Sequence, residues 1–213
     1  MIKYLRADEL AQYPLLQDSM FRDRADQFKR RLKWDVAVDD RGWETDEYDA
    51  LNPLYVLSVG SDGRHQGSMR FLPTVGPTMI NDHFAHLLGN QRLSDPQIWE
   101  CTRFCIGPTA GPQLAGQLMA AGGEILRGFG LLGFAGVFDE RMVRIYNRIG
   151  SKPEIIGSQG QASARISVGV WRFSGDARAR VSHRSRLSQS AMEHWFKCRF
   201  GAHAKNPFLT LPA

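Results

Sequence analysis

The chain has 213 residues, of which 43% are hydrophobic, and its 27 lysines and arginines outnumber its 22 acidic residues. This length and composition are typical of one globular domain and exclude an intrinsically disordered chain. No apolar run approaches the roughly 18 residues that a membrane-spanning helix needs, and residues 1–10 lack the apolar segment of a signal peptide. We therefore expect a cytoplasmic protein without a membrane span, and the net charge of +5 suits an acidic partner.

Hydrophobic periodicity and turn residues predict the elements in chain order. They are a helix over 8–32, a polar loop over 34–51, a hairpin of strands over 54–59 and 66–72, a short helix over 80–89, a strand over 99–106, a helix over 111–130, a strand over 131–138, a helix over 139–149, a strand over 164–173 and a helix over 186–199. A hairpin followed by crossover connections indicates an α/β chain with a mixed sheet, in a single domain over 1–213.

The C-terminal part, about 176–213, is a basic extension that carries the last helix. Its arginines cluster in "DARARVSHRSR" (176–186). Such a cluster suits a nucleic acid, an acidic protein or a merely solvated tail, and we favour the tail. No nucleic-acid recognition motif accompanies it, so we expect no nucleic-acid partner.

The stretch "WECTRFCI" (99–106) places Glu100 and Arg103 inside an otherwise apolar strand. Buried charges are unfavourable unless they are paired or used, which leaves a structural ion pair or a catalytic carboxylate with a charged partner. A spacing of three sends the two side chains to opposite faces of a regular strand. A β-bulge would bring them together; alternatively, Glu100 faces a substrate while Arg103 anchors the loop that carries Asp46 and Asp49, and we favour this second arrangement.

Six charged residues fall in segments expected to be partly buried, and three are positive and three negative. They are Arg24, Asp46, Asp49, Arg70, Glu100 and Arg103. A balanced set of this kind can form a charged cluster with little net field. The alternative is that each one lies on the surface.

These six residues, with Phe28, Trp34 and Phe84, resemble the invariant set of the acyl-homoserine-lactone synthases, the autoinducer synthases of bacterial quorum sensing. The spacing agrees at every position, and "FRDRADQFKRRLKW", "DEYDALNPLYVL", "GSMRFLPT" and "WECTRFCIGP" look like that family. The resemblance implies an acetyltransferase-like (GNAT-like) three-layer fold: a twisted mixed sheet with helices on both sides, and a cleft where neighbouring strands part.

The family likeness also implies the chemistry. An acyl group passes from an acyl thioester, usually on acyl carrier protein, to the amine of S-adenosylmethionine; the product then closes to a lactone and releases methylthioadenosine. S-adenosylmethionine is a substrate, so no cofactor is expected. The pair His83 and His86 has no carboxylate at helical spacing, so no metal site is expected either.

The resemblance assigns roles to the matched residues. Glu100 would act as the general base, directly or through one water. The five other charged residues would surround S-adenosylmethionine, and Phe28 and Trp34 would pack over it, because aromatic faces attract cations such as a sulfonium. Phe84 would pack near the cleft.

An acidic carrier protein needs a basic docking patch. The candidates lie on or after the helix over 139–149: Arg141, Arg144, Arg148 and Lys152. The alternative is a solvated helix face.

Family members that make 3-oxo lactones commonly carry Ser or Thr on the strand before that helix. "FAGVFDER" has no hydroxyl, which predicts an acyl chain without a 3-oxo group.

The main alternative function is an acyl-CoA-dependent N-acyltransferase of related fold. Such enzymes bind the pyrophosphate in a Gly-rich turn at a helix N-terminus. The corresponding stretch, "GPTAGPQLAG" (107–116), lacks the Arg/Gln-x-x-Gly-x-Gly/Ala pattern. This absence argues against a CoA pyrophosphate site.

Overall fold

The computed structural model describes residues 1–208, and its seven strands form one sheet in the order β1-β2-β3-β4-β5-β7-β6. The strands are β1 (Ile2–Arg6), β2 (Leu54–Val59), β3 (His65–Pro73), β4 (Ile98–Ile106), β5 (Gly133–Asp139), β6 (Glu154–Gln159) and β7 (Ile166–Arg172). All neighbouring strands run antiparallel except β4 and β5, which are parallel. The predicted hairpin and the mixed sheet are confirmed.

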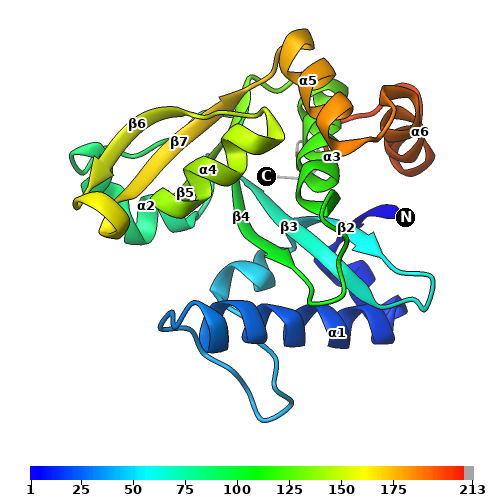
Figure 1. Ribbon diagram of the computed structural model, residues 1–213, viewed down its shortest axis with the longest axis horizontal. Coiled ribbons are helices and arrows are strands. Elements are labelled where there is room, and N and C mark those ends of the chain that lie inside the picture. The colour runs from blue at the N-terminus through cyan, green and yellow to red at the C-terminus, as the bar shows by residue number, and fades with distance from the viewer. Residues whose placement is uncertain (209–213) are drawn as a thin grey trace.

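Helices cover both faces of this sheet. The α-helices of the described residues are α1 (Pro14–Arg24), α2 (Met79–His83), α3 (Leu114–Phe129), α4 (Glu140–Ile149), α5 (Gly175–Ser185) and α6 (Gln189–Phe200). Figure 1 shows α1 along one side of the sheet and α3 with α6 along the other. None of the helices in the described residues has the length and apolar character needed to cross a membrane.

Alternate residues of the strands form two separate cores, which produces the three layers. Val56 and Phe71 face α3 and pack against Leu118, whereas Tyr55 and Leu57 face α1. A strand covered on both faces buries all of its residues, and successive side chains point alternately into one core and the other. The predicted three-layer fold with helices on both sides is therefore confirmed.

The two parallel strands stay together only at their beginnings. They pair over Ile98–Glu100 and Gly133–Ala135, although both strands continue beyond this point. From here β4 and β5 diverge, and the sheet opens in its middle. This is the cleft that the family likeness implied.

Strand β4 contains a β-bulge at the point of divergence. Ser68 pairs with Cys105 and Arg70 with Thr102, so three steps along β4 match two along β3, and Arg103 has a positive φ of 50°. A non-glycine residue in this region is uncommon, and bulges redirect side chains beside active sites. The bulge brings Arg103 to the face that carries Arg70, where it also contacts the loop. The bulge of the first arrangement and the contact of Arg103 with the loop from the second are thus both present, whereas Glu100 does not line the cavity.

The predicted helix over 8–32 is divided into three segments. Residues Ala7–Gln12 form a 3-10 helix, Pro14 opens α1, and Ala25–Arg31 widen into a π-helical segment. Proline fits the first turn of a helix because the N–H group that it lacks would have no intrahelical partner there.

The predicted bounds of α4 are confirmed. Asp139 accepts a hydrogen bond from the Met142 N–H at the start of the helix, and Gly150 ends it.

Two strands and one α-helix of the described residues were not predicted: β1, β6 and α5. Strand β6 is an exposed edge strand without alternating burial, so it has no hydrophobic pattern. Helix α5 occupies the segment for which we favoured a solvated tail, and that expectation is wrong. Arg178 of α5 reaches the buried carboxylate of Glu124 on α3 at 2.6 Å, which fixes the helix to the core. Residues 209–213 of the expected extension lie outside the described residues.

Candidate active site

Three arginines and three carboxylates form a connected cluster on the α1 face of the sheet. We call it the ionic cage, and it consists of Arg24, Arg70 and Arg103 with Glu44, Asp46 and Asp49. The arginines come from the end of α1, from β3 and from the bulge of β4. The carboxylates all come from the last part of the 34–51 loop.

Two of the arginines are fully buried. Arg24 donates through Nε to Glu44 at 2.6 Å and through Nη1 and Nη2 to Asp49 at 2.9 and 2.8 Å. Arg70 binds Asp49 at 2.8 Å and also pairs with Asp46. Forked contacts of this kind suit the planar guanidinium, and buried charges are tolerated because every one has a partner.

Arg103 closes the cage on the side of the cleft. Its Nη2 lies 2.8 Å from Glu44 and 2.7 Å from Asp46, and it is only slightly exposed. Its guanidinium also lies over the Phe28 ring, 5.4 Å from the ring centroid. Arg103 therefore connects the interior of the cage to the cleft wall.

The loop is shaped so that its carboxylates point inward. Asp46 precedes the short 3-10 helix Glu47–Leu51 and accepts hydrogen bonds from the Tyr48 and Asp49 N–H groups, while Asp49 accepts one from the Asp46 N–H. This reciprocal capping box fixes both side chains. Burial alone would raise the pKa of Asp49, but Arg24 and Arg70 beside it hold that pKa well below its usual range.

The structure brings together in the cage the five residues Arg24, Asp46, Asp49, Arg70 and Arg103, whereas Glu100, the sixth charged residue of the sequence analysis, lies apart from them. The third carboxylate is Glu44, which is fully buried between Arg24 and Arg103, and not Glu100. A signal for Glu44 exists: it stands two residues before Asp46 in an extended segment, so both side chains point the same way.

Glu100 lies on the same strand as Arg103 but in a separate polar site. It is 1% exposed, and its carboxylate accepts hydrogen bonds from the N–H groups of Met79 at 3.0 Å and Ile80 at 2.6 Å, in the first turn of α2. Burial raises the pKa of Glu100 to about 7, although both hydrogen bonds act in the opposite direction. The carboxyl group can therefore exchange a proton near neutral pH.

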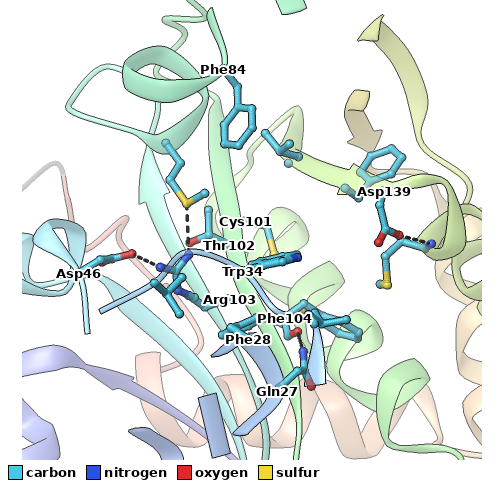
Figure 2. Close-up of a pocket in the computed structure, with 18 of the residues that line it drawn as sticks. Gln27, Phe28, Trp34, Asp46, Phe84, Cys101, Thr102, Arg103, Phe104 and Asp139 are labelled. Atoms are coloured by element: carbon cyan, nitrogen blue, oxygen red, sulfur yellow. Dashed lines mark hydrogen bonds and ion pairs between the residues drawn. The ribbon is translucent and has the colours of Figure 1, made fainter. Parts of the chain in front are cut away.

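A cavity of about 1020 Å³ opens where β4 and β5 diverge, and it reaches both faces of the sheet. One end is polar, with Glu44, Asp46 and Arg103 in its wall; the other is apolar, with Phe134 and Trp171. Figure 2 shows Asp46 and Asp139 on opposite sides, with Trp34 between them. A charged end and an apolar end in one cavity suit two dissimilar substrates.

The predicted aromatic residues line this cavity. Phe28 and Trp34 stack with their ring centroids 5.1 Å apart, and Phe84 lies on the far side of the opening (Figure 2). The predicted residues Arg24, Asp49 and Arg70 are not in the lining, because they form the buried layer behind it. Glu100 is also absent from the lining.

Gln27 was not predicted as a site residue, yet its side chain lines the cavity and binds the open edge of β4. Its side-chain amide donates to the Phe104 carbonyl at 2.8 Å and accepts from the Ile106 N–H at 3.0 Å. It thereby satisfies part of the edge of β4 that β5 has left. The π-helical segment that carries Gln27 also carries Phe28, and such segments are frequent at functional sites.

The four residues of the predicted carrier-protein patch are exposed, on α4 and just after it. Arg141 pairs with Asp139 at 2.6 Å and reaches the cavity. Within residues 1–208, no ion pair is formed by the side chains of Arg144, Arg148 or Lys152. The patch therefore begins at the cavity and continues along the open face of α4.

Known proteins resemble this chain in sequence and in fold. The family model described as "Autoinducer synthase" matches residues 9–181. An acyl-homoserine-lactone synthase of Rhizobium etli is 36% identical over 201 residues, which cover 90% of this chain and 93% of that protein. The solved structure of the AHL synthase LasI has a TM-score of 0.74 at 27% identity, over 86% of this chain and 94% of that one.

A second solved structure, the CoA-dependent acyl-homoserine lactone synthase BjaI with SAM and isopentyl-CoA, has a TM-score of 0.76 at 23% identity. It covers 88% of this chain and 90% of that one, and at this identity it supports the fold. Because the family model spans most of the chain and a relative matches it almost end to end, the chain belongs to the autoinducer synthase family, the acyl-homoserine-lactone synthases, and is an acyltransferase.

Proposed function

We propose that the chain uses S-adenosylmethionine and an acyl thioester in the cavity between β4 and β5, and that acyl carrier protein delivers the acyl group. The observation that carries this proposal is the position of the ionic cage. It forms one wall of a cavity whose opposite end is apolar, so a charged amino acid and an acyl chain can meet in the middle.

The polar end suits S-adenosylmethionine. The stacked rings of Phe28 and Trp34 offer aromatic faces to the sulfonium, and Asp46 and Glu44 add negative charge to the same wall. Arg103 offers a guanidinium to the methionyl carboxylate. Because the cage is held by many mutual contacts, these groups keep their orientation without a substrate.

Acyl transfer requires that the substrate ammonium lose a proton, and we assign this step to Glu100. Its raised pKa of about 7 suits a general base at neutral pH. Because Glu100 lies behind the cavity wall, we propose that one water relays the proton. Amide formation then expels the thiolate.

Lactone closure follows within the same molecule. The methionyl carboxylate attacks its own γ-carbon, the C–S bond breaks, and methylthioadenosine leaves with the electron pair on sulfur. An intramolecular step depends on orientation more than on a strong base, and the folded polar end of the cavity can provide that orientation. No further cofactor enters this scheme, and the expected cytoplasmic location stays a prediction.

The basic patch supports a carrier protein as the donor. Three exposed side chains, Arg144, Arg148 and Lys152, make no ion pair in the part of the chain that the structure describes, and they extend from the mouth of the cavity. Carrier proteins are acidic, so such a patch would accelerate their association. The alternative donor is acyl-CoA, which the related synthase BjaI takes.

The test incubates the purified protein with S-adenosylmethionine and the same acyl group on carrier protein or on CoA. Methylthioadenosine and lactone are measured by chromatography and mass spectrometry. We expect both products in equal amounts, with higher kcat/KM for the carrier-protein donor. Glu100→Gln should abolish both products, whereas Glu154→Gln, which removes an exposed carboxylate of β6, should not. Absence of both products with every donor would refute the proposal.

A further inference from the structure

A phenol that makes no hydrogen bond within the described part of the chain lies at the apolar end of the cavity. Tyr146 of α4 is 6% exposed and lines the cavity. Its hydroxyl makes no hydrogen bond to any of residues 1–208, and it is not among the polar atoms sealed away in the core. The O–H group is therefore directed at the cavity space.

The other buried hydroxyl in the cavity wall behaves differently. Tyr48 donates to the Asp82 carboxylate at 3.0 Å, so its bonding capacity is used within the protein. Buried hydroxyl groups without a partner are unfavourable and rare. The contrast indicates that the bonding partner of Tyr146 comes from outside the chain.

Packing holds the Tyr146 ring in place. It meets Phe138 edge-to-face at 5.3 Å between centroids and Trp171 at 4.8 Å. Trp171 is itself fixed, because its indole N–H donates to the Ser151 carbonyl at 2.9 Å. A ring held on two sides presents its hydroxyl in a defined direction, which is a requirement for selective recognition.

The surroundings make this hydroxyl a donor. Burial, and then the neighbouring Cys101 and Asp139, raise the pKa of Tyr146, so the phenol keeps its proton. Asp139 does not accept that proton, because its oxygens bind the Met142 N–H and Arg141. The phenol is thus free to bind an uncharged oxygen acceptor.

The position of Tyr146 indicates where along the ligand this acceptor lies. The last residues that pair between β4 and β5 are Glu100 and Ala135. Cys101 and Gly136 directly follow them. A β-carbon on Gly136 would stand 3.0 Å from the Cys101 carbonyl, so the two strands are still close at this level. The same β-carbon would stand 3.2 Å from the Trp171 ring, against which the Tyr146 ring packs, so Tyr146 lies one ring away from this level. The reacting carbonyl is expected at this divergence, so the acceptor lies within a few bonds of it.

We propose that Tyr146 donates a hydrogen bond to an oxygen substituent on the acyl chain close to the thioester, and that the enzyme therefore prefers 3-hydroxy- or 3-oxoacyl donors over unsubstituted donors of equal length. This inference rests on the proposed function. It replaces the expectation of a chain without a 3-oxo group, which depended on the lack of a hydroxyl in "FAGVFDER" (134–141); here the hydroxyl comes from Tyr146 of α4.

The test compares wild type with Tyr146→Phe, which keeps the ring and removes only the hydroxyl. Octanoyl, 3-hydroxyoctanoyl and 3-oxooctanoyl groups are presented on one carrier protein, and kcat/KM is measured from methylthioadenosine release. One neutral hydrogen bond predicts that wild type favours an oxygenated donor by about 2- to 12-fold. Tyr146→Phe should lose this preference and keep its rate with octanoyl. The control is Tyr13→Phe, outside the cavity, which should match wild type.

Each alternative gives a distinct result. If Tyr146→Phe slows all three donors equally, the phenol binds a group that all of them share, such as the arm that carries the thioester, and the proposal is overturned. If the variant keeps the donor preference of wild type, the ring serves packing alone, and the proposal is likewise overturned. A wild-type enzyme without preference for oxygenated donors also overturns it. Failure of the proposed function looks different, because then no donor yields methylthioadenosine.

Discussion

The buried carboxyl group of Glu100 makes the stability of this protein depend on pH. Its pKa rises from 4.5 to about 7 on folding, a difference that corresponds to about 3.4 kcal/mol. A group with a raised folded pKa contributes its full stability below the unfolded pKa, and this contribution is lost as pH rises through the folded pKa. Between pH 5 and 8, Glu100 alone should lower the free energy of unfolding by about 2.5 kcal/mol.

Glu100→Gln removes this titration. The amide cannot accept from both N–H groups of α2, so the variant also loses some free energy of unfolding. This loss does not change with pH. The quantity to measure is therefore the difference in unfolding free energy between variant and wild type, obtained in urea from tryptophan fluorescence at pH 5, 6, 7 and 8. We expect the variant to gain about 2.5 kcal/mol relative to wild type over this range.

The control for this experiment is Glu154→Gln, which removes one exposed carboxylate. A difference between Glu100→Gln and wild type that stays constant from pH 5 to 8 would refute the reasoning. It would mean that burial does not hold the Glu100 proton, and the assignment of this residue as the base would lose its electrostatic support.

Three further predictions concern the cage, the C-terminal helices and the patch. Glu44→Gln removes a charge that two buried arginines share and should destabilise the fold by about 3–5 kcal/mol in urea unfolding. Arg178→Ala removes one of two partners of buried Glu124 and should lower Tm by about 4–8 °C, corresponding to about 2 kcal/mol, with kcat unchanged. Combined Arg144→Glu and Arg148→Glu changes should raise KM for the carrier-protein donor and reduce its salt dependence, with KM for S-adenosylmethionine unchanged.

Each of these predictions has an outcome that contradicts it. Wild-type stability of Glu44→Gln would mean that the two arginines do not depend on this carboxylate. A loss of kcat in folded Arg178→Ala would connect α5 to the chemistry. A KM for the carrier-protein donor that equals the wild-type value at every salt concentration would show that the carrier docks elsewhere.

Most of the sheet could be predicted because its strands are buried along most of their length. Strand β2 is buried throughout, and β7 is buried over five of its seven residues, so their apolar runs are plain in the sequence. Edge strand β6 buries none of its residues, and helix α5 is fixed by an ion pair from Arg178 to Glu124. Neither leaves a hydrophobic pattern.

The site was predictable where spacing carries the information. The arginines and aspartates of the cage stand at positions that a family likeness can match one by one. Glu44 was missed because it looked like one more acid in a polar loop, and Tyr146 because its ring fits a core helix position. In both cases the role depends on the contacts made in the folded protein: Glu44 gains two arginine partners, and the Tyr146 hydroxyl gains none within residues 1–208.

The side-chain amide of Gln27 takes the place of a missing strand. By bonding the Phe104 carbonyl and the Ile106 N–H, it occupies positions on β4 that a neighbour in a continuous sheet would fill. The gap between β4 and β5 is therefore a permanent feature of the sheet, and a ligand can enter it without breaking hydrogen bonds between paired strands. In hydrogen–deuterium exchange, the Ile106 N–H should exchange slowly, because it donates to the Gln27 side chain and not to a neighbouring strand.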